Sequence, residues 1–502
     1  MNVLGTIVSS EEGPSTGAFA FVVAPNARVR KGAFVQVKAG SGRIVGSVQE
    51  ILRSNRYFER PESVSEYGKG SSGISSAFPV GEWEYSVASC VVNGFFSESL
   101  ERCFVPPSPG AQVEEADDTL LSQVTGFDEN GLEIGKMLQH SLPARVSPTR
   151  LLQKHLAVLG MSGCGKSNLS AVILEELILR PKERGRLAAV AFDAHGDYIG
   201  FADLRNKEFA SKTRIIEGSE MRIAASSLSP ALLRELMPDV TRTAARDFAK
   251  VVNALKKEGE AFGLAELIEA VQSTDSLKDS VRQPLLSWLD ELSELDLFGK
   301  TDYPAMQGLV EPGKLAVFDL SSVSSLRKKQ ALVSFFGRKL FNLRRDGKIP
   351  PYVMLVEEAH NFAPEKTAKG GAVSKTIIET LAREGRKFGA CLCLVSQRPV
   401  HLSTTALSQC NSFIVMRVTN PYDLNHIAES CESIDKSSQD QITSLGVGEA
   451  LLLGEAVNFP LFTCVRVRKT SKAGRGTPLE QMAKEYEDSL TAKQDGDAKA
   501  FV

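Results

Sequence analysis

The sequence predicts an α/β fold built on a parallel sheet and preceded by a small β-barrel, and three observations predict it. Short alternating apolar runs separated by Gly, Pro and Asn occupy roughly the first 140 residues, as in small all-β units. From Leu151 onward, strand-like and helix-like stretches alternate, which is typical of a parallel sheet covered by helices. A glycine-rich turn ending in Lys166 and Ser167 stands between the first such strand and helix, where α/β folds bind phosphate.

The N-terminal part, residues 1–145, contains about six short strand-like runs and lacks the helical period. Strands are predicted at Ala20–Val23, Phe34–Val37, Ile44–Ile51 and Val87–Phe96, with a loop rich in Ser and Gly over Ser65–Pro79. Because closure removes the unpaired edges of so small a sheet, this spacing predicts a barrel.

Residues 146–225 and 301–470 are predicted to form the α/β core, which a helical insertion interrupts at 226–300. Core strands are expected at His155–Gly160, Leu187–Phe192, Leu315–Leu320, Tyr352–Val356, Ala390–Ser396 and Ser412–Val418, and core helices at Ser167–Leu179 and Leu326–Leu343. In the insertion, apolar spacing predicts helices at Ala231–Met237, Ala244–Lys257 and Val281–Leu295. The polar and charged tail, 471–502, is expected to be an extended arm or disordered.

Composition limits the class of protein. The 502 residues carry a net charge of −2, so no global basic field indicates nucleic acid, and a DNA-binding surface would have to be local. Eight cysteines are present without a CxxC pair, which argues against a zinc ribbon or a disulfide framework. The N-terminus does not resemble a signal peptide, and no apolar run approaches the ~20 residues that span a bilayer. We expect a soluble cytoplasmic protein that does not bind a membrane.

A phosphate site is predicted by Gly160-Met-Ser-Gly-Cys-Gly-Lys-Ser167, which matches GxxxxGK[ST]. The glycines let backbone N–H groups surround phosphate oxygens, and the helix N-terminus adds a favourable dipole. Lys166 would neutralise the β- and γ-phosphates of ATP, and Ser167 would ligate Mg²⁺. Because the match stands between a predicted strand and a predicted helix, a chance glycine turn is disfavoured. The nucleotide-binding candidates in this segment are Gly160, Ser162, Gly163, Cys164, Gly165, Lys166, Ser167 and Asn168.

An acidic pair follows the predicted strand Tyr352–Val356. The strand would deliver Glu357 and Glu358 to the edge of the sheet at which open α/β folds bind ligands. Glu357 would orient the water shell of Mg²⁺, and Glu358 would polarise the attacking water as general base. The alternative is that the two glutamates begin a solvated loop.

Further polar residues complete the predicted site. Gln397 follows the strand that ends at Ser396, a position suited to sensing the γ-phosphate. Arg383 and Arg386 are three residues apart on a predicted helix and therefore share one face. In a ring of subunits they could act on a neighbour's nucleotide as arginine fingers, while the alternative is a basic solvated face.

Two other classes of phosphate-loop protein fit less well. A GTPase would carry NKxD for guanine, and the nearest match, Asn206–Phe209, lacks the Asp. A small nucleoside kinase would need neither this length nor an acidic strand end almost 200 residues after the phosphate loop.

The ordered set of motifs resembles the HerA family of the FtsK–HerA superfamily of hexameric DNA motors. The segments that carry the resemblance are His155–Asn168, Phe192–Tyr198, Val356–His360, Ala382–Gly389 and Ser396–Pro399. The resemblance covers nearly the whole chain. It implies a RecA-like ATPase core, an N-terminal HAS barrel, a homohexameric ring with ATP at subunit interfaces, and duplex DNA in the central channel.

The resemblance also implies roles for residues that match the motifs. Lys166 and Ser167 would bind phosphate and Mg²⁺, Glu358 would be the base, Gln397 the sensor, and Arg383 or Arg386 would act in trans. Asp193 and His195 would lie near the nucleotide or the channel, and Lys154 would contact a neighbour's nucleotide. Arg466–Thr470 would form a last strand leading to the next subunit, with Arg468 and Lys469 as nucleotide contacts. The tail, 471–502, would act as a brace between subunits.

Cys164 departs from the family, which commonly has Ser or Thr at this position of the phosphate loop. Its side chain is expected to face away from the nucleotide, so the change should be tolerated. The thiol is also expected to make the enzyme sensitive to thiol reagents.

Double-stranded DNA would be held by loops on the channel side of the sheet, chiefly through phosphate contacts. The loop after the acidic pair offers Lys366, Lys369 and Lys375, and the alternative is a solvated surface loop. The implied function is an ATP-dependent DNA translocase or helicase working with a nuclease of the NurA type, in DNA end processing or antiviral defence. The alternative function is an ATPase ring that scaffolds and regulates a defence effector, sirtuin-like or nuclease, docked on the barrel.

Overall fold

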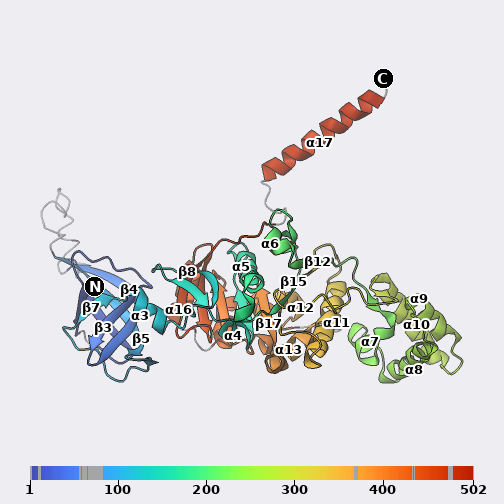
Figure 1. Ribbon diagram of the computed structural model, residues 1–502, viewed down its shortest axis with the longest axis horizontal. Coiled ribbons are helices and arrows are strands. Elements are labelled where there is room, and N and C mark those ends of the chain that lie inside the picture. Colours follow the sequence, from blue (N-terminus) through green and yellow to red (C-terminus); the bar gives the residue numbers. More distant parts are fainter. Residues whose placement is uncertain are drawn as a thin grey trace.

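The computed structural model describes residues 3–9, 13–55, 58, 65, 83–366, 371–431, 434, 436–472 and 479–500. Figure 1 shows three parts in a row: a β-barrel at one end, an α/β core in the middle, and a group of helices at the other end. The loop predicted over Ser65–Pro79 lies outside the described residues except for its first residue.

The N-terminal barrel is closed, as predicted. Pairing runs around a complete circuit, β1-β2-β5-β4-β3-β7 and back to β1. Its core contains inward side chains such as Phe21, Val35 and Val113. The strands are β1 (Val3–Val8), β2 (Ala18–Val23), β3 (Phe34–Ala39), β4 (Gly42–Asn55), β5 (Glu84–Phe96) and β7 (Gln112–Glu115), with the short β6 (Leu100–Glu101) added to β5.

The predicted boundary of the barrel at residue 145 is wrong. After helix α3 (Asp118–Val124), strands β8 (Leu132–Met137) and β9 (Pro143–Val146) join the sheet of the α/β core instead, where β8 pairs with a strand near the C-terminus. The period-two pattern of these strands resembles that of the barrel strands. Such a pattern identifies a strand but not the sheet that it joins.

The core is an eleven-stranded sheet that is parallel over its first seven strands. Each of these strands, apart from the edge strand β12, is buried on both faces, which explains their continuous apolar sequences. Because parallel strands end at one edge, the loops after them meet there. In spatial order the strands are β12 (Thr213–Glu217), β15 (Leu315–Asp319), β11 (Ala188–Asp193), β16 (Tyr352–Val356), β17 (Ala390–Ser396), β10 (Leu156–Leu159), β18 (Ser412–Met416), and then antiparallel β19 (Glu449–Gly454), β20 (Leu461–Val465), β8 and β9.

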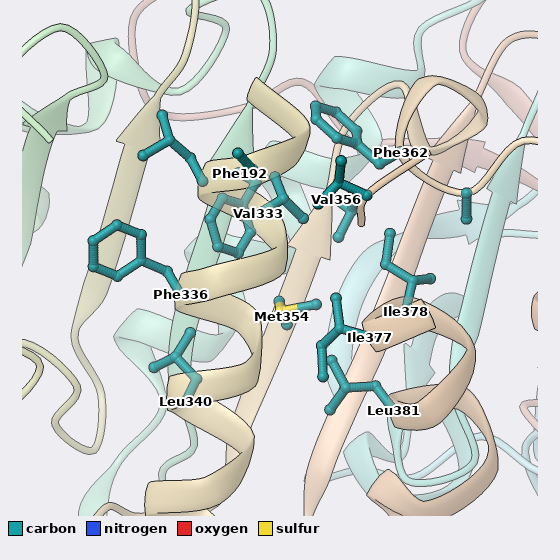
Figure 2. Packing of buried hydrophobic residues seen from close by; sticks show 14 of the residues in the cluster. Phe192, Val333, Phe336, Leu340, Met354, Val356, Phe362, Ile377, Ile378 and Leu381 are labelled. Carbon is teal, nitrogen blue, oxygen red and sulfur yellow. The ribbon is translucent and has the colours of Figure 1, made fainter. Parts of the chain in front are cut away.

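Helices cover both faces of this sheet. Helix α5 (Lys166–Leu179) packs on one face, while α11 (Leu326–Arg345) and α13 (Lys375–Phe388) pack side by side on the other. Figure 2 shows the second face, where side chains three or four residues apart on each helix meet those of the central strands. The labelled residues are Phe192, Val333, Phe336, Leu340, Met354, Val356, Phe362, Ile377, Ile378 and Leu381.

Four helices occupy the segment predicted as an insertion. They are α7 (Pro230–Leu236), α8 (Arg242–Glu258), α9 (Leu264–Ser273) and α10 (Asp279–Glu294). The chain leaves and rejoins the core through the short pair β13 (Ile223–Ala224) and β14 (Phe298–Gly299). A salt bridge of 2.8 Å between Arg338 of α11 and Glu235 of α7 links the two parts.

Shorter helices connect the remaining strands. They are α4 (Pro148–Leu152), α6 (Lys207–Ala210), α12 (Ala359–Phe362), α14 (Thr404–Leu407), α15 (Pro421–Ser430) and α16 (Lys436–Ser444), with 3₁₀ turns at Lys182–Arg184, Ile199–Ala202, Ala225–Ser227 and Pro399–His401. In the described part of the chain, no helix combines the length and the apolar character required to cross a bilayer.

The C-terminal region differs from the sequence prediction in two ways. Arg466–Thr470 do not form a strand, because the backbone N–H groups of Lys469 and Thr470 donate to the Glu175 side chain of α5 rather than to a neighbouring strand. The tail contains helix α17 (Leu479–Ala500), which stands away from the rest of the molecule in Figure 1. Leu479, Met482 and Tyr486 are exposed on this helix.

Candidate nucleotide-binding site

The phosphate loop connects β10 to α5. Gly163 and Gly165 have positive φ values of 78° and 112°, which glycine adopts without steric cost. No side chain caps the N-terminus of α5, so its first N–H groups are free for an anion. Gly160 is required by packing, since a Cβ there would lie 2.8 Å from Cys164 Sγ and 2.9 Å from Met416 Cβ.

Lys166 and Cys164 point in different directions in this loop. Lys166 borders the cavity above the loop, and its Nζ donates to the Met161 carbonyl at 2.9 Å. Cys164 is buried beneath the loop, and burial raises the pKa of its thiol. A buried, protonated thiol is a poor nucleophile, which argues against the sensitivity to thiol reagents expected from the sequence.

Three oxygen-bearing side chains meet beside the phosphate loop. Ser167 Oγ donates to Asp197 Oδ2 at 2.8 Å and lies 3.5 Å from Glu357 Oε1. Glu357 Oε2 is buried without a partner among the described residues. Burial and the nearby carboxylates of Asp193 and Asp197 raise the pKa of Glu357 well above its usual range. A divalent cation would relieve this repulsion and use the free oxygen, so the group fits a hard cation such as Mg²⁺.

Sequence reasoning missed two charged residues that border the cavity, Lys472 and Asp197. Asp197 lies in the quoted motif Phe192–Tyr198. Asp193 organises the loop that presents it. Its carboxylate accepts from the backbone N–H groups of His195, Gly196, Asp197 and Tyr198 at 2.8–3.2 Å. Asp193 is therefore buried beneath the loop rather than directed at the cavity. The signal in the sequence that could have identified Asp197 is a second carboxylate four residues after Asp193, which ends a strand.

Glu358 sits immediately beyond β16 in a strained conformation. Its φ is 49°, in the left-handed region that non-glycine residues rarely adopt; such strain is concentrated at functional sites. Its carboxylate oxygens lie 3.5 Å from His195 Nε2 and 3.3 Å from His360 Nδ1. Burial raises the pKa of Glu358, while Lys166 and His195 oppose that rise. Burial also lowers the pKa of His360 to about 4.

The ends of β10, β16 and β17 line one cavity of about 450 Å³, a volume suited to a nucleotide. Gln397 follows β17, which lies between β10 and β16 in the sheet. Most predicted nucleotide-binding residues border this cavity. The lining residues are Ser162, Gly163, Gly165, Lys166, Ser167, Asn168, His195, Asp197, Glu357, Glu358, Val395, Gln397, Arg468 and Lys472.

Several predicted site residues lie away from this cavity. Lys154 is paired with Glu455. Arg383 and Arg386 are exposed on α13, and Arg383 lies 3.5 Å from Glu379. The side chain of Lys469 is exposed outside the lining.

Two of the three DNA-contact candidates lie in the described part of the chain, and they are near each other because Lys375 contacts the residue before Lys366. Lys366 is exposed in the segment between α12 and α13. Lys375, the first residue of α13, donates to the Glu365 carbonyl at 3.0 Å. Lys369 lies outside the described residues.

The chain matches the family model described as "Helicase HerA, central domain" over residues 132–340. It is 27% identical to the DNA double-strand break repair helicase HerA of Pyrococcus furiosus, and the alignment covers 92% of each chain. It is 25% identical to the protein of the same name from Saccharolobus solfataricus, over 86% of this chain and 87% of the relative.

Solved structures show the fold again. VirB4 of Thermoanaerobacter pseudethanolicus superposes with a TM-score of 0.54 at 13% identity, over 68% of this chain and 99% of the other. The family model begins at residue 132, where β8 begins the core sheet. With relatives aligned over nine-tenths of its length and a phosphate loop set beside an acidic strand end, the chain is similar to the HerA helicases and carries the site of a P-loop ATPase.

Proposed function

We propose that this ATPase is a motor for double-stranded DNA that works as a hexameric ring with a nuclease partner, in DNA end processing or antiviral defence. The observation that carries the proposal is the convergence of the phosphate loop, the Glu357–Glu358 pair and Gln397 on one cavity. The relatives named DNA double-strand break repair helicase support DNA as the substrate. The nuclease partner rests on the family resemblance.

Six of the lining residues have a chemical task in this proposal. Ser167, Asp197 and Glu357 hold Mg²⁺, which neutralises phosphate charge when bound. Lys166 supplies a further positive charge to the β- and γ-phosphates. Glu358 accepts a proton from the attacking water. Gln397 follows β17, the strand between β10 and β16, and hydrogen-bonds to the γ-phosphate of bound ATP.

The exposed arginines of α13 support a site completed by a neighbouring subunit. Arg383 and Arg386 do not border their own subunit's cavity, and an arginine supplied in trans stabilises the charge of the transition state. We assign one of them to the neighbour's nucleotide, together with Lys154. Lys366, Lys369 and Lys375 are proposed to contact DNA phosphates within the ring.

Mixing experiments test the trans assignment. Subunits carrying Arg383→Ala or Arg386→Ala should inhibit rings that also contain wild-type subunits, because each variant disables a site that it does not itself form. ATP turnover is measured while the variant fraction is increased at constant total protein. Loss of activity steeper than proportional supports the trans role, whereas a strictly proportional loss for both arginines contradicts it. Arg205→Ala, an exposed arginine held by Asp203, is the matched control.

The proposed function is tested by ATP turnover with and without linear duplex DNA, with the particle mass measured in the same buffer. Strong stimulation by duplex in a hexamer-sized particle supports a DNA motor. A particle smaller than a ring, or a DNA-independent rate, contradicts it. Single-stranded DNA of the same length is the control for nonspecific polyanion effects.

A second candidate function is an ATPase ring that serves mainly as scaffold and regulator of a defence effector, sirtuin-like or nuclease. It is favoured by exposed apolar side chains on the barrel, where Phe104 and Val105 are 76% and 70% exposed, as at protein-docking surfaces. Its distinguishing result is a hexamer whose turnover is indifferent to duplex DNA and to charge reversal at Lys366 and Lys369.

A further inference from the structure

Residues 466–472, here called the C-terminal strap, cross the phosphate-loop helix of their own subunit. The strap follows β20 directly and ends with Lys472, which borders the nucleotide cavity together with Arg468. Two hydrogen bonds connect it to Asn168, the residue after Ser167: Asn168 Nδ2 donates to the Arg466 carbonyl at 2.9 Å, and Arg468 N donates to Asn168 Oδ1 at 3.1 Å. The strap is thus attached to the first turn of α5.

Glu175 holds the strap at a second point, about two turns further along α5. Its carboxylate is fully buried and accepts from Arg466 Nη1 at 2.7 Å, Lys469 N at 2.6 Å, Thr470 N at 2.8 Å and Thr470 Oγ1 at 2.9 Å. A charged group costs several kcal/mol to bury unless its hydrogen-bonding capacity is met. The strap supplies these hydrogen bonds, so the burial of Glu175 in α5 and the position of the strap depend on each other.

Arg468 lies between these two attachment points and is 8% exposed. Its Nε donates to Thr470 Oγ1 at 2.9 Å, its Nη1 donates to the Asp197 carbonyl at 3.1 Å, and its guanidinium lies 5.5 Å from the centre of the Phe201 ring. Nη2 is buried without a hydrogen-bond partner in the described structure. Two of the nitrogens therefore fix the guanidinium beside the Ser167–Asp197 pair, while the third has unmet hydrogen-bonding capacity.

The path of the strap beyond Thr470 leaves no spare room. A Cβ on Gly200 would lie 2.0 Å from the Ser471 carbonyl oxygen, and Ser471 Oγ donates to Asp203 Oδ2 at 2.8 Å. The loop that carries Asp197 and the strap therefore fit against each other through backbone contact. A side chain at position 200 would therefore displace the strap from this path.

We propose that Glu175 is a positioning residue that holds the C-terminal strap over the site, so that Arg468 presents its positive charge to the phosphates of ATP bound in the same subunit. The proposal rests on the proposed binding of ATP at this cavity. It gives the site a cation from the C-terminal end of the chain, next to the one supplied by the phosphate loop. It also explains a buried carboxylate in a helix that otherwise buries mainly apolar side chains on the sheet.

A double-mutant cycle on nucleotide affinity tests the proposal. The dissociation constant of a fluorescent, non-hydrolysable ATP analogue is measured for the wild type, Glu175→Gln, Arg468→Gln and the double variant. Glu175→Gln keeps the side-chain volume and removes the charge that anchors the strap. Each single change should weaken binding about tenfold, the size of a charge-assisted hydrogen bond. Because Glu175 acts through Arg468, the double variant should bind no more weakly than the weaker single variant.

Glu176→Gln is the matched control. Glu176 is the next residue on α5 and pairs with Arg466 Nη2 at 2.9 Å, but no backbone N–H group of the strap donates to its side chain among the described hydrogen bonds. Its substitution should change the affinity by less than about threefold. An equal effect of Glu176→Gln and Glu175→Gln would overturn the specific role of Glu175.

Amide hydrogen exchange gives a readout that does not depend on turnover. In the wild type, the analogue should slow exchange at the amides of Lys469 and Thr470 by about tenfold, because bound phosphate holds Arg468 and hence the strap. The Glu175→Gln variant should lose this protection while keeping it at the phosphate loop. Two results would overturn this proposal and leave the proposed function standing. One is unchanged protection in the variant. The other is a double variant whose nucleotide affinity falls by the product of the two single effects. A wild type that binds no nucleotide would overturn the proposed function as well.

Discussion

Lys166→Ala should leave the chain folded and unable to bind or hydrolyse ATP. The side chain makes one described hydrogen bond, to the Met161 carbonyl, so its removal costs the fold about 1 kcal/mol. At the site it removes the positive charge placed over the phosphate loop, a loss worth at least ~100-fold in affinity or turnover. It also removes a charge that holds down the pKa of Glu358, which further disfavours the base form of that carboxylate.

The measurement pairs nucleotide binding by calorimetry with the melting temperature of the same sample. Lys182→Ala is the control, since Lys182 is exposed in the turn after α5 and away from the cavity. A Lys166→Ala protein that hydrolyses ATP at the wild-type rate would overturn the assignment of the phosphate site. A lowered melting temperature together with lost binding would call for Lys166→Met, which keeps most of the side-chain volume.

The phosphate site was predictable because its information is local. The glycine pattern, the lysine and the serine are adjacent in sequence, and their strand–turn–helix context shows in the apolar runs on either side. The same holds for Glu357 and Glu358, which a buried strand delivers to the predicted edge of the sheet. Gln397 needed one further step, the order of strands, and β17 does lie between β10 and β16.

The sequence could not show which strands pair when they lie far apart along the chain. Strands β8 and β9 alternate like barrel strands, and only the pairing of β8 with β20, more than 300 residues later, places them in the core. The family resemblance likewise implied a strand at Arg466–Thr470, which the structure does not form. Instead, the Arg466 side chain and the backbone N–H groups of Lys469 and Thr470 donate to the buried Glu175. No local pattern on α5 marks a glutamate as the anchor of a distant segment.

Asp197 shows a different limit. Sequence reasoning placed the loop correctly but singled out Asp193 and His195. In the structure the carboxylate of the buried Asp193 accepts hydrogen bonds from four backbone N–H groups, while Asp197 contacts Ser167. Two aspartates four residues apart cannot be told apart by residue type. Only the loop geometry shows which one supports the loop and which one faces the cavity.

Glu358→Gln should bind ATP with wild-type affinity and fail to turn it over. The amide keeps the size of the carboxylate and the strained backbone at φ 49° is common to both residues, so the free energy of unfolding should change by about 1 kcal/mol or less. The amide cannot accept a proton from water, and losing a general base lowers turnover by ~10² to 10⁴-fold.

Single-turnover hydrolysis, measured beside equilibrium binding, separates the two effects. Glu384→Gln, an exposed acidic residue of α13, controls for the loss of one negative charge near the arginine-bearing face. If Glu358→Gln hydrolysed ATP at the wild-type rate, the base would have to be another carboxylate, and Asp197 would be the first candidate because it borders the same cavity. If instead it lost ATP binding, the carboxylate would belong to the cation site. If the variant keeps its affinity for ATP and loses turnover, Glu358 is the base that accepts a proton from the attacking water, and Glu357 remains the ligand of the metal.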